Sequence, residues 1–287
     1  MRDNCTLLKE GMEMEKEKPI ELLEKIREAN PLIHNITNIV VANFTANGLL
    51  ALGASPVMAD AVEEVADMAK AANAVVLNIG TLNEKAVEAM ILAGKSANEN
   101  GVPVVLDPVA AGSTRYRTET AKKLLKEIRF TSIRGNAGEI ANLIGIDAKV
   151  KGVDAGDTGL DTGELALKAA KTLHTTVVVS GKTDAVSNGT NLYLVHNGHP
   201  LLTKVTGTGC LLSAVCGAFL AVEKDPVQAS VSALAIYGAA AEIAREKTGG
   251  DLPGSFQMAF LDQLAEIGAE EIQKYASKYA SFEKKEG

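Results

Sequence analysis

The sequence predicts an α/β fold with a mainly parallel central sheet, helices on both faces and a helical C-terminal third. Short, continuous Val, Leu and Ile runs such as 74–80 and 176–181 alternate with longer segments of helical periodicity. This alternation is typical of parallel strands that are buried on both faces. Aromatic residues make up only 4% of the 287 residues, and Trp is absent. The core must therefore be built from aliphatic side chains, which suits helices packed on a sheet.

Along the chain, apolar runs and helical patterns follow one another in order. The first helix is expected at 40–52, before a short strand and turn at 53–60. The main strands are expected at 74–80, 102–107, 130–134 and 176–181. The helices between them are expected at 63–72, 83–100, 118–128 and 162–173. The alternation over 184–198 predicts a hairpin at the sheet edge. The helices of the C-terminal third are expected at 210–223, at 226–247 and from 253 onward.

The chain is expected to form one domain, residues 19–287, preceded by a disordered arm, residues 1–18. The arm holds four basic and five acidic residues with little apolar periodicity, a composition typical of solvated segments. No low-complexity linker or internal repeat divides the rest of the chain. At this length a single domain buries about three quarters of its unfolded surface, so it needs no disulfide or metal to be stable.

Charge and cysteine content argue against several classes of function. With 29 basic and 36 acidic residues the net charge is −7, which argues against binding to nucleic acid or to an anionic membrane surface. Three cysteines without CxxC spacing predict neither a disulfide framework nor a zinc site. Free thiols indicate a reducing compartment. The first 30 residues lack a signal-peptide pattern, and no uncharged apolar stretch reaches ~18 residues, so a cytoplasmic protein without a membrane span is expected.

The strongest local signal is the glycine-rich stretch Val205–Cys210, which opens an apolar helix. Gly207 and Gly209 allow backbone N–H groups to turn inward, and the helix N-terminus adds partial positive charge. Together they can form an anion hole for a phosphate group; the alternative is an ordinary glycine turn before a helix. Neither a Walker A loop nor a GxGxxG stretch after the first strand occurs, which argues against a P-loop and a Rossmann dinucleotide site.

Cys210 stands in the first turn of that helix. A helix N-terminus lowers the pKa of a thiol, so Cys210 is a candidate weak general base or nucleophile; the alternative is a small core residue. Cys216, six residues later on an apolar helix face, is expected only to pack in the core. The four histidines show no metal-ligand spacing, and none is expected to be catalytic.

Polar residues also follow other predicted strands, at the edge where open parallel sheets bind ligands. The segment Arg134–Glu139 ends one strand and opens a helix, with Asn136 and Glu139 on one helical face. Glu139 and Asp107 can supply carboxylates to Mg²⁺, which takes one or two carboxylates together with phosphate oxygens. The alternatives are a capping carboxylate for Glu139 and a turn residue for Asp107. The segment Ser180–Thr183 either shapes a nucleotide pocket or forms a β-turn.

Two N-terminal segments, 30–38 and 53–60, are uninformative from physical chemistry alone. Met58, in the second of them, can cover a flat heteroaromatic ring with its polarisable sulfur. A methionine is more often simply part of a core.

Five segments nevertheless form a recognisable set. They are His34-Asn35-Ile36-Thr37-Asn38, Ala54-Ser55-Pro56-Val57-Met58, Leu106-Asp107-Pro108-Val109, Arg134-Gly135-Asn136-Ala137-Gly138-Glu139-Ile140 and Gly207-Thr208-Gly209-Cys210. In order and spacing, from about residue 20 to about residue 280, the chain resembles the hydroxyethylthiazole kinase family of thiamine salvage, in the ribokinase-like superfamily. The Gly-Thr-Gly-Cys segment is shared with hydroxymethylpyrimidine kinases, so the two N-terminal segments make the resemblance specific.

The resemblance implies phosphorylation of the hydroxyl of 4-methyl-5-(2-hydroxyethyl)thiazole by ATP with Mg²⁺, to give the thiazole phosphate used to build thiamine phosphate. It also implies a homotrimer with the thiazole pocket at subunit interfaces. The implied thiazole contacts are Met58, Gly207 and Asn35, the implied ATP contacts are Arg134, Ser180, Thr208 and Gly209, and the implied metal ligands are Glu139 and Asp107. Cys210 stands where many relatives in the superfamily carry a catalytic Asp, and the resemblance makes it a weak base.

Two other functions stay open. A kinase of the pyrimidine half of thiamine would use the same fold, and competition between the two alcohols separates it from a thiazole kinase. A nucleotide sensor without turnover would bind ATP but release no ADP in the presence of the thiazole. The presence of Cys210, Asp107 and Glu139 argues against the sensor.

Overall fold

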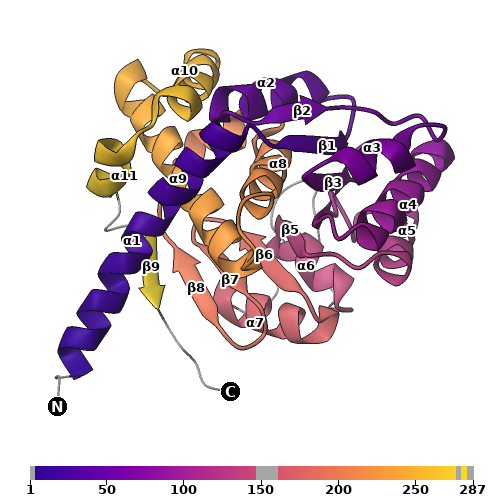
Figure 1. Cartoon of the computed structure of the whole chain (residues 1–287), viewed down its shortest axis with the longest axis horizontal. Coiled ribbons are helices and arrows are strands. Elements are labelled where there is room, and N and C mark those ends of the chain that lie inside the picture. Colours follow the sequence, from indigo (N-terminus) through magenta and orange to yellow (C-terminus); the bar gives the residue numbers. More distant parts are fainter. Residues whose placement is uncertain (1–3, 147–160, 276–278, 283–287) are drawn as a thin grey trace.

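The computed structural model describes residues 4–146, 161–275 and 279–282 (Figure 1). The strands are β1 (Leu32–Ile36), β2 (Ser55–Val57), β3 (Ala74–Asn78), β4 (Val104–Asp107), β5 (Ser132–Asn136), β6 (Thr176–Ser180), β7 (Asp184–Ser187), β8 (Leu192–Val195) and β9 (Tyr279–Phe282). They form one sheet in the order β2-β1-β3-β4-β5-β6-β7-β8-β9. Neighbours from β2 to β6 are parallel, and the pairs from β6 to β9 are antiparallel. The predicted mainly parallel α/β sheet is confirmed, with the hairpin at its edge.

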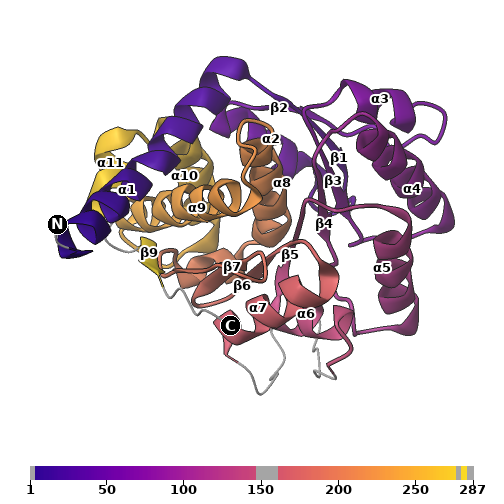
Figure 2. The ribbon, with the colours of Figure 1, turned by 60° about the horizontal axis from the view of Figure 1, so that its bottom comes forward.

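Helices cover both faces of the sheet (Figure 2). One layer consists of α1 (Asn4–Ala29), α2 (Ala42–Leu52), α8 (Thr208–Leu220), α9 (Pro226–Thr248), α10 (Pro253–Glu266) and α11 (Ala269–Tyr275). The other consists of α3 (Val65–Ala71), α4 (Glu84–Glu99), α5 (Arg115–Glu127), α6 (Ala137–Leu143) and α7 (Thr162–Leu173). A short 3₁₀ helix, η1 (Pro200–Lys204), precedes α8. The helical C-terminal third is thus confirmed.

Successive residues of the central strands face alternate layers. In β3, Val76 belongs to the core cluster beneath α8 and α9, whereas Val75 and Leu77 belong to the opposite cluster. Both faces of the sheet are therefore buried beneath helices, which explains the continuous apolar runs in the sequence. By length and composition α9 could cross a membrane, but 89% of its apolar window is buried inside the protein, as befits the central helix of its layer.

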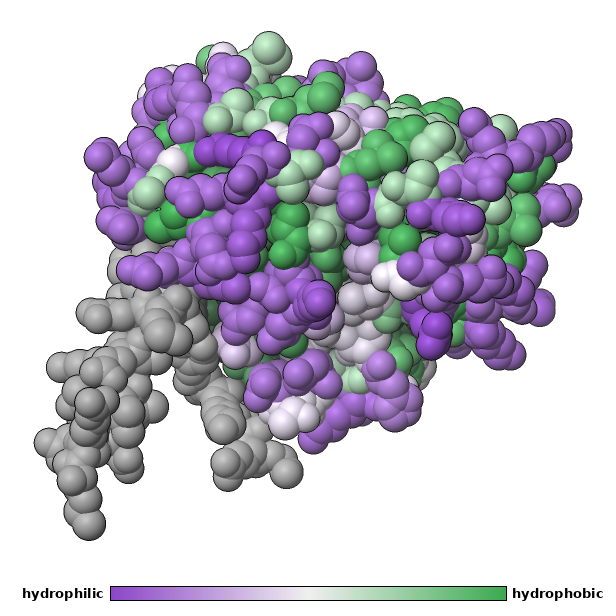
Figure 3. Space-filling model, in the orientation of Figure 1, coloured by the Kyte–Doolittle hydropathy of each residue, from purple (hydrophilic) through white to green (hydrophobic). Residues whose placement is uncertain are grey.

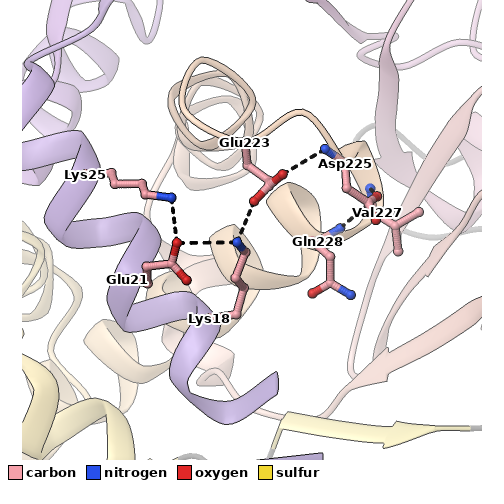
Figure 4. A network of polar contacts seen from close by, with 7 residues as sticks. All are labelled: Lys18, Glu21, Lys25, Glu223, Asp225, Val227 and Gln228. Carbon is pink, nitrogen blue, oxygen red and sulfur yellow. Dashed lines mark hydrogen bonds and ion pairs between the residues drawn. The ribbon is translucent and has the colours of Figure 1, made fainter. Parts of the chain in front are cut away.

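The helix α1 takes in most of the segment for which a disordered arm is expected, since the backbone of 4–18 is helical. Lys18 is tied to the body of the protein (Figure 4): its Nζ lies 2.7 Å from Oε2 of Glu223, in the turn between α8 and α9, and 3.5 Å from Oε1 of Glu21. Glu223 in turn accepts a hydrogen bond from the N–H of Asp225, whose carboxylate caps α9. Residue 18 is thus anchored, and the boundary between arm and domain stays a prediction.

Two strands differ from the sequence-based expectation. β1 lies inside the parallel part of the sheet, between β2 and β3, although no strand is expected there. Its sequence mixes polar and apolar residues, since the buried side chains include those of His34 and Asn35. Buried polar side chains interrupt the apolar run on which strand prediction rests. β9 follows α11, where continuous helix is expected, and pairs with β8. Residues 283–287, the end of the predicted domain, lie outside the described part of the chain.

Candidate active site

Polar side chains gather at the carboxyl ends of β3 to β6, beside the first turn of α8. Asn78 and Asp107 end neighbouring strands and are paired in register, and Ser180 ends β6 opposite Asn136 of β5. Arg134 lies two residues before the end of β5. Ligands of open parallel sheets bind at this edge, so the structure places these residues where a site is expected.

Arg134 is the central cation of this site. Its Nη2 donates a hydrogen bond to Oγ of Ser180. Burial lowers the pKa of the guanidinium, but the negative charges of Asp107, Glu139 and other nearby groups outweigh this effect and raise it. Its Nε is buried and has no hydrogen-bond partner among the described residues. Arg134 therefore balances several carboxylates at once and keeps one N–H group unused.

Asp107 is a buried carboxylate held by two donors. Its Oδ2 accepts hydrogen bonds from Nδ2 of Asn78 at 2.7 Å and from Oγ of Ser213, in α8, at 2.9 Å. No hydrogen bond reaches its Oδ1 within the described parts of the chain. Burial raises the pKa of Asp107 to about 7, although the charge of Arg134 lowers it. The carboxylate thus changes protonation near neutrality and keeps one oxygen for a ligand.

Glu139 serves as a capping residue and also ties two loops together. Its N–H donates to Oδ1 of Asn136 at 2.9 Å, and the N–H of Asn136 donates to its Oε2 at 2.8 Å, which completes a capping box for α6. Its Oε1 accepts a hydrogen bond from the N–H of Ala110, after β4, at 2.7 Å. Burial raises the pKa of Glu139, while these backbone donors lower it. The capping alternative is confirmed, and any ligand role comes in addition to it.

The loop before α8 has the form of a glycine turn that exposes N–H groups. Gly207 has φ +89° and forms the N-cap. A Cβ on Gly209 would lie 2.8 Å from Nη1 of Arg134, so the guanidinium packs against the glycine. The Thr208 hydroxyl donates to the carbonyl oxygen of Leu202 at 2.7 Å, which leaves only the backbone N–H of Thr208 for an anion. The first N–H groups of a helix have no partner within it, so this turn can receive a phosphate.

Cys210 is partly exposed in the first turn of α8. Nδ2 of Asn38 donates a hydrogen bond to its Sγ at 3.4 Å. Burial and the charge of Asp107 raise the pKa of the thiol to about 12, although Asn78, Arg134 and Asn38 lower it. The lowered pKa expected at a helix N-terminus is not found, because burying a thiolate beside a carboxylate raises the pKa of this thiol.

Two of the residues expected to contact the thiazole, Met58 and Asn35, lie on or beside the neighbouring strands β1 and β2, whereas Gly207 lies before α8. Met58 follows β2 directly and is half-buried. Nε2 of His34 donates to the carbonyl oxygen of Ala59 at 2.7 Å, which fastens the Met58 loop to β1. Asn35 is 1% exposed, donates to the carbonyl oxygen of Ile33, and has an Oδ1 without a partner among the described residues. No described hydrogen bond joins this group to the cluster around Arg134.

Four further residues belong to the cluster: Asn38, Asn78, Asp184 and Ser213. Asn78 is one of the polar residues expected at this edge, since it follows an apolar run, whereas the sequence predicts no role for the other three. Asp184 accepts the N–H of Gly181, and burial raises its pKa to about 6. Cys216 is fully buried in α8, so its packing role is confirmed.

The sequence model of the hydroxyethylthiazole kinase family matches residues 23–270. The chain belongs to this family. Its fold is similar to that of the hydroxyethylthiazole kinase from Pyrococcus horikoshii OT3, with 45% sequence identity and a TM-score of 0.82 over 89% of this chain and 95% of that chain. The resemblance carried by the five motifs is thereby confirmed.

More distant structures show the fold of this family member. A ribokinase-like superfamily protein from Enterococcus faecalis matches at 12% identity and a TM-score of 0.60, over 85% of this chain and 87% of that one. The ADP/ATP-dependent NAD(P)H-hydrate dehydratase from Bacillus subtilis, co-crystallised with ATP and Mg²⁺ and soaked with CoA, matches at 16% identity and a TM-score of 0.59, over 82% and 91%. The ribokinase-like fold is therefore confirmed.

Proposed function

We propose that this protein transfers the γ-phosphoryl group of ATP to the hydroxyl of 4-methyl-5-(2-hydroxyethyl)thiazole. The observation that carries the proposal is the family match over residues 23–270, on a site that has the parts phosphoryl transfer needs. A guanidinium, free helix N–H groups and two carboxylates converge at one edge of the sheet. Phosphoryl transfer depends mainly on positioning and on neutralising charge, and these groups supply both.

In the reaction, the hydroxyl oxygen of the thiazole alcohol bonds to the γ-phosphorus as the bond to the β,γ-bridging oxygen breaks. ADP leaves with that electron pair. Arg134 and the backbone N–H groups of Thr208, Gly209 and Cys210 stabilise the charge on the transferring group. Ser180 holds the guanidinium of Arg134 for this task. Only the thiolate form of Cys210 can accept the hydroxyl proton and become the thiol. With a pKa of about 12 this form is scarce at neutral pH, so Cys210 acts as a weak base and takes the proton late in the transfer.

The donor set of the site fits Mg²⁺. The described residues contain no cluster of three or more metal-ligating side chains, but Mg²⁺ needs only one or two carboxylates when phosphate oxygens and water complete its shell. Asp107 and Glu139 would hold it, Asp107 through the Oδ1 that no described donor reaches. When bound, Mg²⁺ supplies neutralisation of charge on the phosphate oxygens.

We further propose a cytoplasmic homotrimer whose thiazole pocket, with Met58, Asn35 and Gly207, is completed by a neighbouring subunit. Ile39 and Val40, which follow Asn38 in the chain, are 83% and 64% exposed, and Leu50 on α2 is 59% exposed. Figure 3 shows apolar surface in the upper part of the view, where Figure 1 draws α2 and β2. The exposure of these apolar side chains supports the proposed oligomer, because a second copy would bury them.

Detection of the product tests the proposed substrate. The purified protein is incubated with ATP, Mg²⁺ and an equimolar mixture of the thiazole alcohol and the pyrimidine alcohol of thiamine, and the phosphate esters are separated by mass. Thiazole phosphate as the main product supports the proposal. Pyrimidine phosphate as the main product would transfer the assignment to the pyrimidine kinase, and ATP binding without either ester would favour the sensor.

A further inference from the structure

A chain of buried amides connects Cys210 to Asp107, and the proposed reaction does not use it. We propose that Asn38 is a positioning residue for Cys210. The side-chain amide of Asn38 is held by Asn78, which in turn is held by Asp107, and it donates a hydrogen bond to the sulfur of Cys210. The consequence for catalysis rests on the proposed function. The contact itself is a property of the protein that can be measured without turnover.

The direction of the hydrogen bonds follows from neighbours that have only one possible role. The backbone N–H of Gly80 can only donate, and it reaches Oδ1 of Asn78 at 2.9 Å. The amide of Asn78 is thereby oriented, so its Nδ2 donates to Oδ2 of Asp107 at 2.7 Å. Oδ1 of Asn78 also accepts from Asn38 at 3.0 Å, which requires that Asn38 presents its NH₂ group. The same nitrogen donates to Sγ of Cys210 at 3.4 Å.

The surrounding loops hold Asn38 in this position. Its side chain is 5% exposed, and a Cβ on Gly80 would lie 2.6 Å from its Nδ2, so the glycine makes the space that the amide occupies. The N–H of Ile39 donates to Oγ1 of Thr81 at 3.2 Å. Nη2 of Arg117, from α5, donates to the carbonyl oxygen of Gly80 at 2.7 Å. The loops after β1 and β3 are thus fastened together. They hold the side chain of Asn38 between Asn78, at the end of β3, and Cys210 of α8.

This arrangement has a defined chemical consequence for the sulfur. A donor that points at Sγ favours the thiolate over the thiol, because a hydrogen bond to a charged acceptor is stronger than one to a neutral acceptor. Asn38 therefore opposes the effect of burial and of Asp107 on Cys210.

Alkylation of Cys210 tests the contact without any turnover. Asn38→Asp keeps the size of the side chain but replaces the donor by a negative acceptor. The rate of modification by iodoacetamide at pH 8 is followed for the peptide that contains Cys210, so the other cysteines do not interfere. We expect a decrease of at least about tenfold, as for the loss of a hydrogen bond to a charged group. Mere loosening of the site would instead raise the rate, because it increases access to the sulfur.

The matched control is Asn83→Asp. Asn83 is exposed and caps α4 by accepting the N–H of Ala86, a role that an aspartate performs equally well. This variant carries the same change of charge and should alkylate at the wild-type rate. Unchanged or faster modification in Asn38→Asp, with its melting temperature preserved, would overturn the inference.

A double-mutant cycle then tests the role in catalysis. If Asn38 acts through Cys210, then Asn38→Asp lowers kcat at least about tenfold in the wild-type background, with the KM for ATP unchanged. In a Cys210→Ala background it should have little further effect. Equal losses in both backgrounds would show that Asn38 does not act through the sulfur. If the wild-type protein shows no thiazole-dependent turnover, the proposed function fails while the alkylation result still decides the contact.

Discussion

The guanidinium of Arg134 packs against the Cα of Gly209, so closely that a Cβ at position 209 would approach Nη1 of Arg134 to 2.8 Å. Strand β5 thereby places the guanidinium of Arg134 directly beside the free N–H groups at the start of α8. A positive side chain and a helix N-terminus act on the same point, where the transferring phosphate is proposed to lie.

The first prediction concerns this close approach. Gly209→Val should lower kcat by about 10²–10³, the cost of losing oxyanion-type donors, because the branched side chain displaces Arg134 and crowds the phosphate. The fold should persist, since the position is at a helix start. The control is Gly254→Val, another first-turn glycine, where an added Cβ would have nothing within 4 Å. Near-normal kcat in Gly209→Val would show that this turn does not hold the phosphate.

The second prediction concerns Cys210 as the proton acceptor. Cys210→Ala should lower kcat by about 10²-fold, the low end for removal of a general base, because the loose transition state demands little base strength. Cys210→Asp should restore or improve turnover, since a carboxylate is ionised at neutral pH whereas this thiol, with a pKa of about 12, is not. Steady-state kinetics and melting temperatures of both variants provide the measurement.

The competing interpretation of Cys210 is that it only packs the start of α8. In that case aspartate would bury an unpaired charge next to Asp107 and destabilise the protein. A fully active alanine variant, together with an inactive and unstable aspartate variant, would show that Cys210 is not the base.

The third prediction follows from the raised pKa of Asp107. Its folded-state value of about 7 lies above the unfolded value, so the native state binds more protons between about pH 4 and 7 and stability falls as the pH rises through that range. Asp107→Asn removes this contribution, which is on the order of 4 kcal/mol. In EDTA, the variant should therefore lose less free energy of unfolding between pH 5 and 8 than the wild type. Equal losses would contradict the assignment, and the variant should be inactive as a kinase.

The fourth prediction separates Glu139 from Asp107. Glu139→Gln leaves one carbonyl oxygen to accept the two backbone N–H groups of Asn136 and Ala110. One buried donor loses its partner, at a cost of about 1–3 kcal/mol of unfolding free energy, which urea denaturation measures. Glu164→Gln, an exposed first-turn glutamate of α7, is the control and should change stability by less than about 0.5 kcal/mol. Full stability of Glu139→Gln would mean that the carboxylate does not join the two loops.

The fifth prediction concerns assembly. The 30.0 kDa chain should sediment as a trimer, and Val40→Glu should shift it toward monomer, because a charge would replace an exposed apolar side chain of the proposed interface. Lys204→Glu, an exposed change outside that surface, should leave the trimer intact. A stable and active wild-type monomer would rule out the interface site.

The sequence was sufficient to predict most of the parallel sheet, because strands such as β3 and β6 are buried on both faces and therefore consist of continuous aliphatic runs. It did not predict β1, since His34 and Asn35 are buried there through hydrogen bonds that no local pattern reveals. The Arg134, Asp107 and Glu139 positions were predicted from their place after strands. The pKa shifts of the site could not be predicted in the same way. The pKa of Cys210, for example, depends on the charge of Asp107, which is distant in sequence and near only in the fold.

Thiazole-dependent release of ADP tests the central claim most directly. Purified protein with ATP and Mg²⁺ is assayed in a coupled ADP assay with the thiazole alcohol, with the pyrimidine alcohol and with neither, beside the Gly209→Val variant. We expect ADP release that requires an alcohol, a kcat/KM that is higher for the thiazole, and loss of the signal in the variant. ADP release that is independent of the thiazole, or unaffected by Gly209→Val, would contradict it.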